Sequence, residues 1–160
     1  MTKKRLLAWI PVILCMAAIF LLSGQSGEES GKVSHGVVEL LDPIVEPLYE
    51  DLPPPQQVEF LASFHTLVRK MAHFSIYFLL GAFAFGAFGN YSLPRPWQGA
   101  CALGLSFLYA CSDELHQGLV EGRGPSFTDV LIDTAGAALA ILIATGILLI
   151  RRKKTRTHIL

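Results

Sequence analysis

The sequence predicts an all-α integral membrane protein with four membrane-spanning helices. Hydrophobic residues make up 52% of the chain and charged residues only 16%, which is too apolar for an ordinary soluble domain. The apolar residues gather into four runs, each close to the roughly 17–25 residues that cross a bilayer as one helix. At 160 residues we expect a single domain, residues 1–160, with spans at about 6–22, 71–89, 97–117 and 129–150.

The first span follows the basic residues Lys3, Lys4 and Arg5 and ends before Ser23-Gly24. A basic start and a short apolar run also resemble a secretory signal peptide. Because three further spans follow, we expect this helix to remain uncleaved in the mature protein.

Residues 23–69 are predicted to form an external loop between the first two spans. Its first part, residues 23–34, is rich in Gly and Ser and is predicted to be a loop. Apolar residues then recur at helical spacing over residues 33–48, with acidic residues between them, which predicts an amphipathic segment on the outer surface. Pro43 and Pro47 limit the length of this helix, and Pro53, Pro54 and Pro55 form a stiff break. From residue 56 a helical pattern runs directly into the second span.

The last two spans are joined by a Gly- and Pro-containing hairpin loop at residues 120–127. The third span is apolar up to Cys111 and polar afterwards, and the fourth contains Asp133 near its start. Ionisable groups inside a membrane are costly and are functional by default. These polar ends are therefore the first place to look for a site.

The distribution of basic residues predicts that both termini face the cytoplasm, because Lys and Arg in short loops favour that side. Nine of the 13 basic residues fall in the predicted inner segments: Lys3, Lys4, Arg5, Arg95, Arg151, Arg152, Lys153, Lys154 and Arg156. All 13 acidic residues fall in the outer segments or the outer halves of spans. This orientation places the unusual polar residues at the outer surface.

Helical spacing groups the polar side chains into faces. The second span carries Lys70, His73 and Tyr77 on one face, and Asp129 and Asp133 are one turn apart in the fourth. The third span carries Ser112, Asp113, His116 and Gln117 on one face, whereas Glu114 is turned away from them.

Antiparallel packing of these spans would bring the charged groups to one level. Lys70 and Arg123 can each neutralise one carboxylate, and the remaining carboxylates then need protons, water, a metal or a cationic ligand. The structural alternative is that the acidic groups are solvated, and that Arg123 anchors the hairpin to lipid phosphates or to Asp129.

The residues expected to bind a ligand are Lys70, His73, Tyr77, Ser112, Asp113, Glu114, Gln117, Arg123, Asp129 and Asp133. If the protein is an enzyme, the catalytic candidates are His73, Asp113, Glu114 and His116. No cofactor or metal site is predicted, because no tight motif such as His-x-x-x-His is present; a site with carboxylate and His ligands remains an alternative. The three cysteines lie in apolar runs without Cys-x-x-Cys spacing. The zero net charge gives no argument for a nucleic-acid partner.

At these residues the sequence resembles the VanZ-like family of small bacterial membrane proteins, over nearly its whole length. The resemblance rests on Lys70-Met71-Ala72-His73-Phe74 with Tyr77 and Gly81, on Ser112-Asp113-Glu114-Leu115-His116-Gln117, on Gly122-Arg123 with Ser126, Asp129 and Gly136, and on Ser23-Gly24-Gln25-Ser26 with Ser30 and Ser34. Two positions depart from the family pattern. Asp133 stands where an Asn is usual, and Leu119-Val120-Glu121-Gly122-Arg123 replaces a Phe-x-Pro-Gly-Arg-like loop.

The resemblance implies lowered susceptibility to lipoglycopeptide antibiotics of the teicoplanin type, and a place in the bacterial cytoplasmic membrane. One hypothesis is a non-enzymatic envelope protein that binds a lipid-linked wall precursor, a phospholipid headgroup or the lipoglycopeptide through Lys70 and Arg123. The alternative is a membrane-embedded enzyme acting on a lipid phosphate or acyl group, with His73 or His116 as base or nucleophile. A transporter is less favoured, because the chain is small and has no internal repeat.

Overall fold

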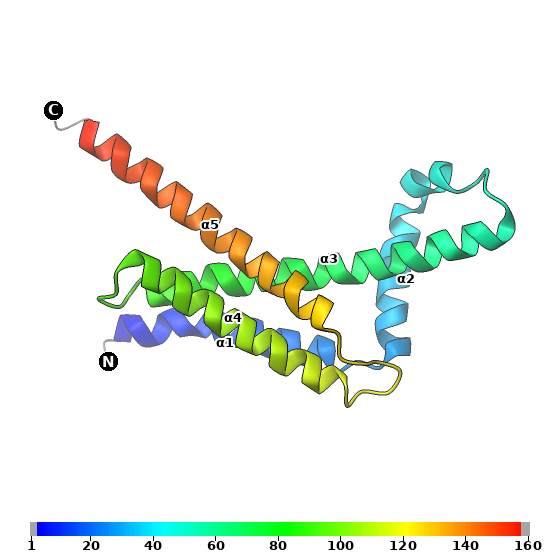
Figure 1. The fold of residues 1–160 in the computed structure, drawn as a ribbon, viewed down its shortest axis with the longest axis horizontal. Helices are drawn as coiled ribbons and strands as arrows, with labels where there is room; N and C mark the ends of the chain where they lie inside the picture. The colour runs from blue at the N-terminus through cyan, green and yellow to red at the C-terminus, as the bar shows by residue number, and fades with distance from the viewer. Residues whose placement is uncertain (1–2, 158–160) are drawn as a thin grey trace.

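The computed structural model describes residues 3–157, and every regular element in this part of the chain is a helix (Figure 1). The elements are α1 (Lys3–Ser23), α2 (Gly27–Val45), the short 3-10 helix η1 (Glu46–Leu48), α3 (Pro54–Phe88), α4 (Arg95–Gln117) and α5 (Phe127–Thr157). The side chains of Ser30, Lys153 and Arg156, which entered the sequence analysis, lie outside the described part. The predicted all-helical fold is confirmed.

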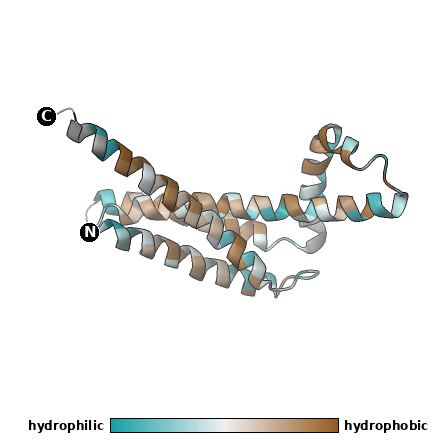
Figure 2. Cartoon of the chain, turned by 45° about the horizontal axis from the view of Figure 1, so that its top comes forward, coloured by the Kyte–Doolittle hydropathy of each residue, from teal (hydrophilic) through white to brown (hydrophobic). Residues whose placement is uncertain are grey.

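Three helices are long and apolar enough to cross a membrane: Lys3–Ser23, Pro54–Phe88 and Phe127–Arg152. By length and composition the chain is thus a multi-pass membrane protein, and Figure 2 shows the apolar residues that dominate the middle of α5. The predicted third span corresponds to α4, which has 23 residues but is not in this group. Its last turns carry Asp113, Glu114, His116 and Gln117, which lower its mean hydropathy.

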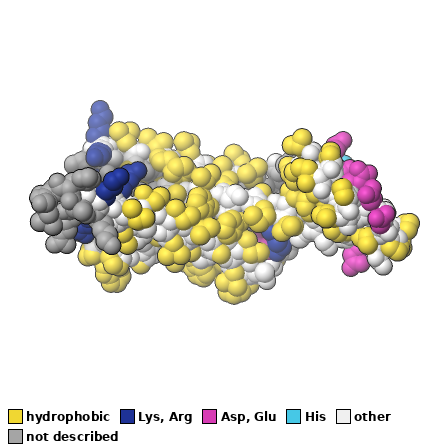
Figure 3. All heavy atoms as spheres, turned by 90° about the horizontal axis from the view of Figure 1, so that it is seen from above, with side chains coloured by type: hydrophobic (Ala, Val, Ile, Leu, Met, Phe, Trp, Pro, Cys, Tyr) yellow, Lys and Arg dark blue, Asp and Glu magenta, His cyan; other side chains and the backbone are white. Residues whose placement is uncertain are grey.

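Helix α3 is the centre of the fold, because it contacts each of the other α-helices. Its side chains Tyr77 and Leu80 are fully buried and pack in one cluster with Val12 and Ile19 of α1 and Val130 of α5. Large apolar side chains also cover much of the outer surface of the helices (Figure 3). An apolar exterior around a small packed core suits a helix bundle whose solvent is lipid.

Small residues let α3 and α5 approach closely. A Cβ added to Gly81 would lie 2.7 Å from the Ala137 backbone, and one added to Gly136 would overlap the carbonyl of Phe74. Small residues at helix interfaces are the usual way for membrane helices to pack backbone against backbone. This contact sets the distance between the polar side chains on the two helices.

The segment predicted as an external loop is largely helical. Helix α2 already begins at Gly27, inside the Gly- and Ser-rich stretch that was predicted to be a loop, so that part of the prediction is wrong. The helix packs on α3 and buries Val38 and Val45, and such packing outweighs the low helix propensity of Gly and Ser. Pro54 starts α3 at a position where a missing N–H costs nothing.

Helix α3 is continuous across the predicted boundary at residue 70, as the sequence indicated. Its 35 residues give a length of about 52 Å, well over the roughly 30 Å of a hydrocarbon core. The first part of α3, with α2 and η1, therefore projects beyond the bundle as an arm (Figure 1).

Both termini lie at one end of the molecule, beside the connection between α3 and α4 (Figure 1). There, Arg5 Nε donates to the Asn90 carbonyl at 3.0 Å, and Trp9 Nε1 lies 3.0 Å from the Tyr91 hydroxyl. The connection between α4 and α5 lies at the opposite end, next to the base of the arm (Figure 1). Figure 3 shows basic side chains toward the terminal end and acidic side chains on the arm.

Candidate functional site

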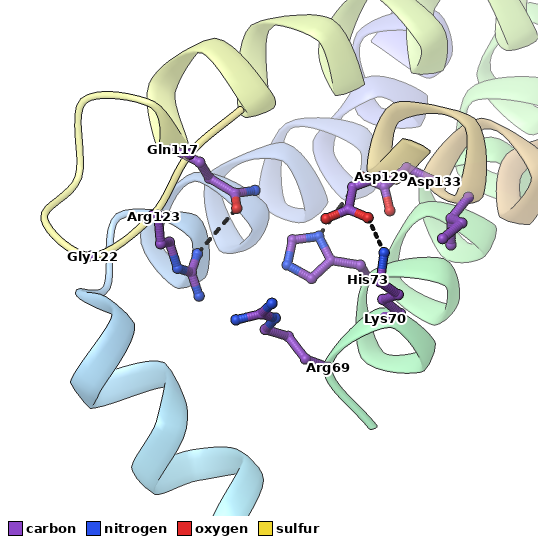
Figure 4. A pocket seen from close by; sticks show the side chains of 10 residues that line it. Arg69, Lys70, His73, Gln117, Gly122, Arg123, Asp129 and Asp133 are labelled. Carbon is purple, nitrogen blue, oxygen red and sulfur yellow. Dashed lines mark hydrogen bonds and ion pairs between the residues drawn. The ribbon is translucent and has the colours of Figure 1, made fainter. Parts of the chain in front are cut away.

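The polar residues converge where α3 leaves the bundle, beside the α4–α5 connection and the first turns of α5. A cavity of about 140 Å³ opens there (Figure 4). It is lined by Arg69, Lys70, His73, Gln117, Gly122, Arg123, Gly124, Asp129, Ile132 and Asp133. Six of the ten predicted ligand-binding residues are in this list, and we call the space the polar cavity.

Lys70 of α3 forms an ion pair with Asp129 in the first turn of α5. The expectation that Lys70 would neutralise one carboxylate is met by this pair. Both side chains remain partly exposed, at 30% and 26%, so water screens their attraction. Asp129 also lies at the helix N-terminus, where the helix dipole favours a negative charge.

His73 of α3 and Asp133 of α5 face each other deeper in the cavity wall. Their Nδ1 and Oδ2 atoms are 3.7 Å apart, which is beyond hydrogen-bond range. Asp133 is fully buried, and neither of its oxygens nor His73 Nδ1 has a hydrogen-bond partner among the described residues. Burying a carboxylate without a hydrogen-bond partner costs free energy of folding. The burial of Asp133 beside His73 therefore has to be explained by some further interaction.

Asp113 of α4 belongs to a chain of side-chain hydrogen bonds. Gln117 Nε2 donates to Asp113 Oδ2 at 3.1 Å, and Arg123 Nη1 donates to Gln117 Oε1 at 3.3 Å. The same Arg123 nitrogen donates to the Ser23 carbonyl at 3.2 Å. Arg123 therefore ties the loop to α1 and α4, and no described carboxylate pairs with it.

Asp113 completes a cluster with the previous pair. One ligand-type atom from each of His73, Asp113 and Asp133 lies within 4.8 Å of the other two. The three residues come from α3, α4 and α5. No spacing within one helix could have revealed this group, because it depends on how three helices are rotated against each other.

Glu114 is turned away from Asp113, as helical geometry predicts. Its Oε2 accepts a hydrogen bond of 2.7 Å from the Ser126 backbone N–H, and the side chain is almost fully buried. Glu114 thus fixes the loop that leads into α5. It supports the site from outside the polar cavity.

Like Asp113, the predicted residues Tyr77, Ser112 and His116 also lie outside the wall of the polar cavity. Ser112 is exposed and donates to the Tyr109 carbonyl of its own helix at 2.8 Å. The His116 ring stacks on Phe20 of α1, with centroids 4.4 Å apart. Tyr77 is fully buried, one turn beyond His73 on α3. The predicted face of four residues on α4 is therefore divided: Asp113 and Gln117 belong to the site, His116 packs on α1, and Ser112 is exposed.

Arg69 lines the polar cavity but was not among the predicted site residues. Arg69 precedes His73 by four residues on α3, so the spacing rule used for the other residues would have included it. Figure 4 shows Arg69 and Arg123 turned toward the same space beside the His73 ring. Burial lowers the pKa of the Arg123 guanidinium, and the positive charge of Arg69 acts in the same direction.

A second cavity, of about 150 Å³, adjoins the first and shares Arg69, His73 and Arg123 with it. The rest of its wall comes from α1, α2 and α3 and from Gln25, and is mainly apolar: Ile19, Leu22, Ser23, Gln25, Ser34, Val37, Val68, Ala72 and Ile76. We call it the apolar cavity. An apolar space next to a cation-bearing one suits an amphipathic ligand.

The helices and the site together define a multi-pass membrane protein with a charged cavity at one end of its bundle. A model of the VanZ/LLP1 family matches residues 8–150. The chain therefore belongs to this family, in agreement with the resemblance seen in the sequence. Comparisons with curated proteins and with solved structures give no significant match.

Proposed function

We propose that this VanZ-like protein binds the phosphate-bearing headgroup of a lipid at the outer face of the bacterial cytoplasmic membrane. Binding of a lipid-linked wall precursor there would lower susceptibility to lipoglycopeptides of the teicoplanin type, as the family membership suggests. The observation that carries the proposal is the pair of adjoining cavities, one polar and one apolar, with Arg69 and Arg123 at their common wall.

The charges of the polar cavity support an anionic ligand. Lys70 is paired with Asp129, whereas neither Arg69 nor Arg123 forms an ion pair with a carboxylate among the described side chains. Two guanidinium groups near each other repel, and a phosphate between them removes that repulsion. Guanidinium also offers a fork of donors that matches phosphate oxygens.

The apolar cavity supports a lipid rather than a free phosphate. Its wall is formed by side chains such as Leu22, Val37 and Val68, and an acyl or prenyl chain gains about 25 cal/mol for each Å² of apolar surface removed from water. A chain in this space would leave its headgroup beside Arg69 and Arg123. The two cavities would then hold the two ends of one molecule.

The orientation in this proposal has both termini in the cytoplasm and four helices across the membrane, with α4 as the third. Two features support it. Several basic side chains lie toward the end that carries both termini (Figure 3), and the positive-inside rule favours the cytoplasm for such an end. The polar end of α4 contacts the α4–α5 connection, through the Glu114–Ser126 and Gln117–Arg123 hydrogen bonds, and protein contacts of this kind let polar groups lie within a membrane.

The test measures binding by the purified full chain in lipid nanodiscs, with a polyprenyl phosphate, phosphatidylglycerol, inorganic phosphate and teicoplanin as separate probes. We expect the polyprenyl phosphate to bind and Arg123→Gln or Arg69→Gln to weaken it at least about tenfold, because each removes a charge-assisted hydrogen bond. Arg95→Gln, an exposed basic residue at the opposite end, is the matched control.

The outcomes distinguish a lipid from free phosphate and from the antibiotic as the ligand. Binding of inorganic phosphate with equal affinity would exclude a role for the apolar cavity. Binding of teicoplanin alone would make the antibiotic itself the ligand. If wild type and Arg123→Gln bind every probe equally, the proposal is wrong. In a bacterial host, expression should raise the teicoplanin concentration needed to stop growth, and Arg123→Gln should remove that increase.

A membrane-embedded enzyme acting on a lipid phosphate is the second candidate. The observation that favours it is that the His73 ring lines both cavities, with Asp133 behind it. His73 would act as the base, whereas the stacked position of His116 gives it no comparable access. Release of phosphate from a labelled lipid by wild type, lost in His73→Ala, would support this candidate, and lipid binding without turnover would dismiss it.

A further inference from the structure

The unsatisfied groups of the polar cavity point to an occupant of their own. Asp133 is fully buried, yet among the described residues neither of its oxygens has a hydrogen-bond partner, and the same holds for His73 Nδ1. Asp113 is 4% exposed and lies within the same cluster. We propose that His73, Asp113 and Asp133 bind one divalent transition-metal ion between α3, α4 and α5.

The geometry suits a cation better than a direct His–Asp contact. Zinc holds nitrogen and oxygen ligands at about 2.0–2.2 Å, so two ligands of one tetrahedral ion lie roughly 3.4 Å apart. The separation of 3.7 Å between His73 Nδ1 and Asp133 Oδ2 is close to that value. The ligand atoms of all three residues lie within 4.8 Å of one another. Only small side-chain movements are therefore needed for them to bind one ion.

Charge gives a second reason. Two carboxylates buried in one cluster repel each other, and each loses its hydration. With neutral His73, a dication would balance the charges of Asp113 and Asp133. In the competing arrangement, protons balance the charges: His73 is an imidazolium and one of the two carboxyl groups is protonated. The experiment must exclude this alternative.

The surrounding residues hold the ligands in place. Gln117 orients Asp113 through its 3.1 Å hydrogen bond, and Arg123 in turn holds Gln117. Such supporting bonds are typical of metal sites. Gly136 packs on the Phe74 backbone and so fixes the spacing between the helices that carry His73 and Asp133.

The ligand set indicates which ion to test. One imidazole with two carboxylates suits Zn²⁺, Mn²⁺ or Fe²⁺, whereas Ca²⁺ takes six to eight oxygen ligands and Mg²⁺ keeps several waters. Three protein ligands leave a position of the ion for water or another ligand. His73 and Asp133 both line the polar cavity, so that position would open toward it.

The experiment measures the metal content of the purified full chain. The protein is stripped with a chelator, loaded separately with Zn²⁺, Mn²⁺ or Mg²⁺, desalted, and analysed by mass spectrometry of the elements. We expect one Zn²⁺ or Mn²⁺ per chain, a higher thermal midpoint with the ion, and little retained Mg²⁺. Bound Co²⁺ should give the visible absorption of a low-symmetry site.

Two variants remove a proposed ligand, one removes a supporting hydrogen bond, and one serves as the control. Asp133→Asn and His73→Gln should lose nearly all bound metal, and Gln117→Ala should weaken binding by about 10–100-fold, because it removes a supporting bond. Glu121→Gln, which changes an exposed carboxylate in the α4–α5 connection, should keep the metal.

A stripped and reloaded wild type that keeps less than a tenth of an ion per chain would overturn the proposal. Retention of a full ion by folded Asp133→Asn would overturn it as well. If Asp133→Asn fails to fold, the metal content of Gln117→Ala and the number of ions bound per wild-type chain test the proposal instead. Metal content does not depend on the lipid, so this result is independent of the proposed headgroup binding.

Discussion

His73 on α3 and Asp133 on α5 face each other with 3.7 Å between Nδ1 and Oδ2, although neither atom has a hydrogen-bond partner in the part of the chain that the structure describes. A backbone contact one residue further along α3 holds them there, because Gly136 of α5 packs directly on Phe74. The spacing of the site is therefore determined by a glycine that carries no functional group.

Gly136→Ala should push α3 and α5 apart, since the new Cβ would overlap the Phe74 carbonyl. We expect a loss of about 1–3 kcal/mol of stability, the usual cost of overpacking a tight contact, together with weaker metal binding. Thermal unfolding in detergent measures the first effect. Gly146→Ala on the same helix is the control, because its Cβ would meet no other described group within 4 Å. Equal midpoints for Gly136→Ala and the control would contradict the prediction.

The Lys70–Asp129 pair should contribute only modestly. Its side chains are 30% and 26% exposed, so a double-mutant cycle with Lys70→Met and Asp129→Asn should give a coupling energy of about 0.2–1 kcal/mol that falls with added salt. Unfolding by denaturant at two salt concentrations provides the measurement. A coupling of several kcal/mol that salt leaves unchanged would mean that the pair is shielded from water.

The proposed orientation can be tested with single cysteines in a background without Cys15, Cys101 and Cys111. Glu121→Cys lies in the exposed α4–α5 connection and Arg152→Cys near the end of α5. A membrane-impermeant maleimide added to intact cells should label position 121 and reach position 152 only after permeabilisation. The reverse pattern would place the cavities on the cytoplasmic side and exclude an outer ligand.

The arm contains a hydrogen bond with a clear dependence on pH. The Tyr49 hydroxyl donates to Asp42 Oδ1 at 2.6 Å, and this bond raises the pKa of Tyr49 to about 12. The ordinary value is about 10, so the contribution of the bond to stability is complete below pH 10 and is lost as the pH rises through about 12.

Asp42→Asn should return the Tyr49 pKa toward the ordinary value. Ultraviolet titration of the phenolate band, with Tyr49→Phe to identify its contribution, measures the change. A titration curve that is the same in Asp42→Asn as in wild type would show that Asp42 does not control the phenol.

Helical spacing predicted relationships within a helix better than relationships between helices. Lys70 and His73 do share the face of α3 that lines the polar cavity, and Glu114 does point away from Asp113. Ser112 and His116, which spacing grouped with Asp113, face outward and toward α1. Periodicity gives the angle between two side chains on one helix, but it does not give the rotation of that helix against its neighbours.

The sequence by itself determined that the chain is helical, apolar enough for a membrane and related to the VanZ-like proteins, because hydropathy, periodicity and motifs are properties of the chain alone. Only the tertiary structure decided that Arg69 shares a cavity wall with Arg123, and that Arg123 bonds Gln117 and Ser23 instead of a carboxylate. It also decided that His73, Asp113 and Asp133 meet. The physical reason is that these contacts depend on the close approach of α3 and α5 at Gly81 and Gly136, and packing of this kind joins residues that no sequence interval relates.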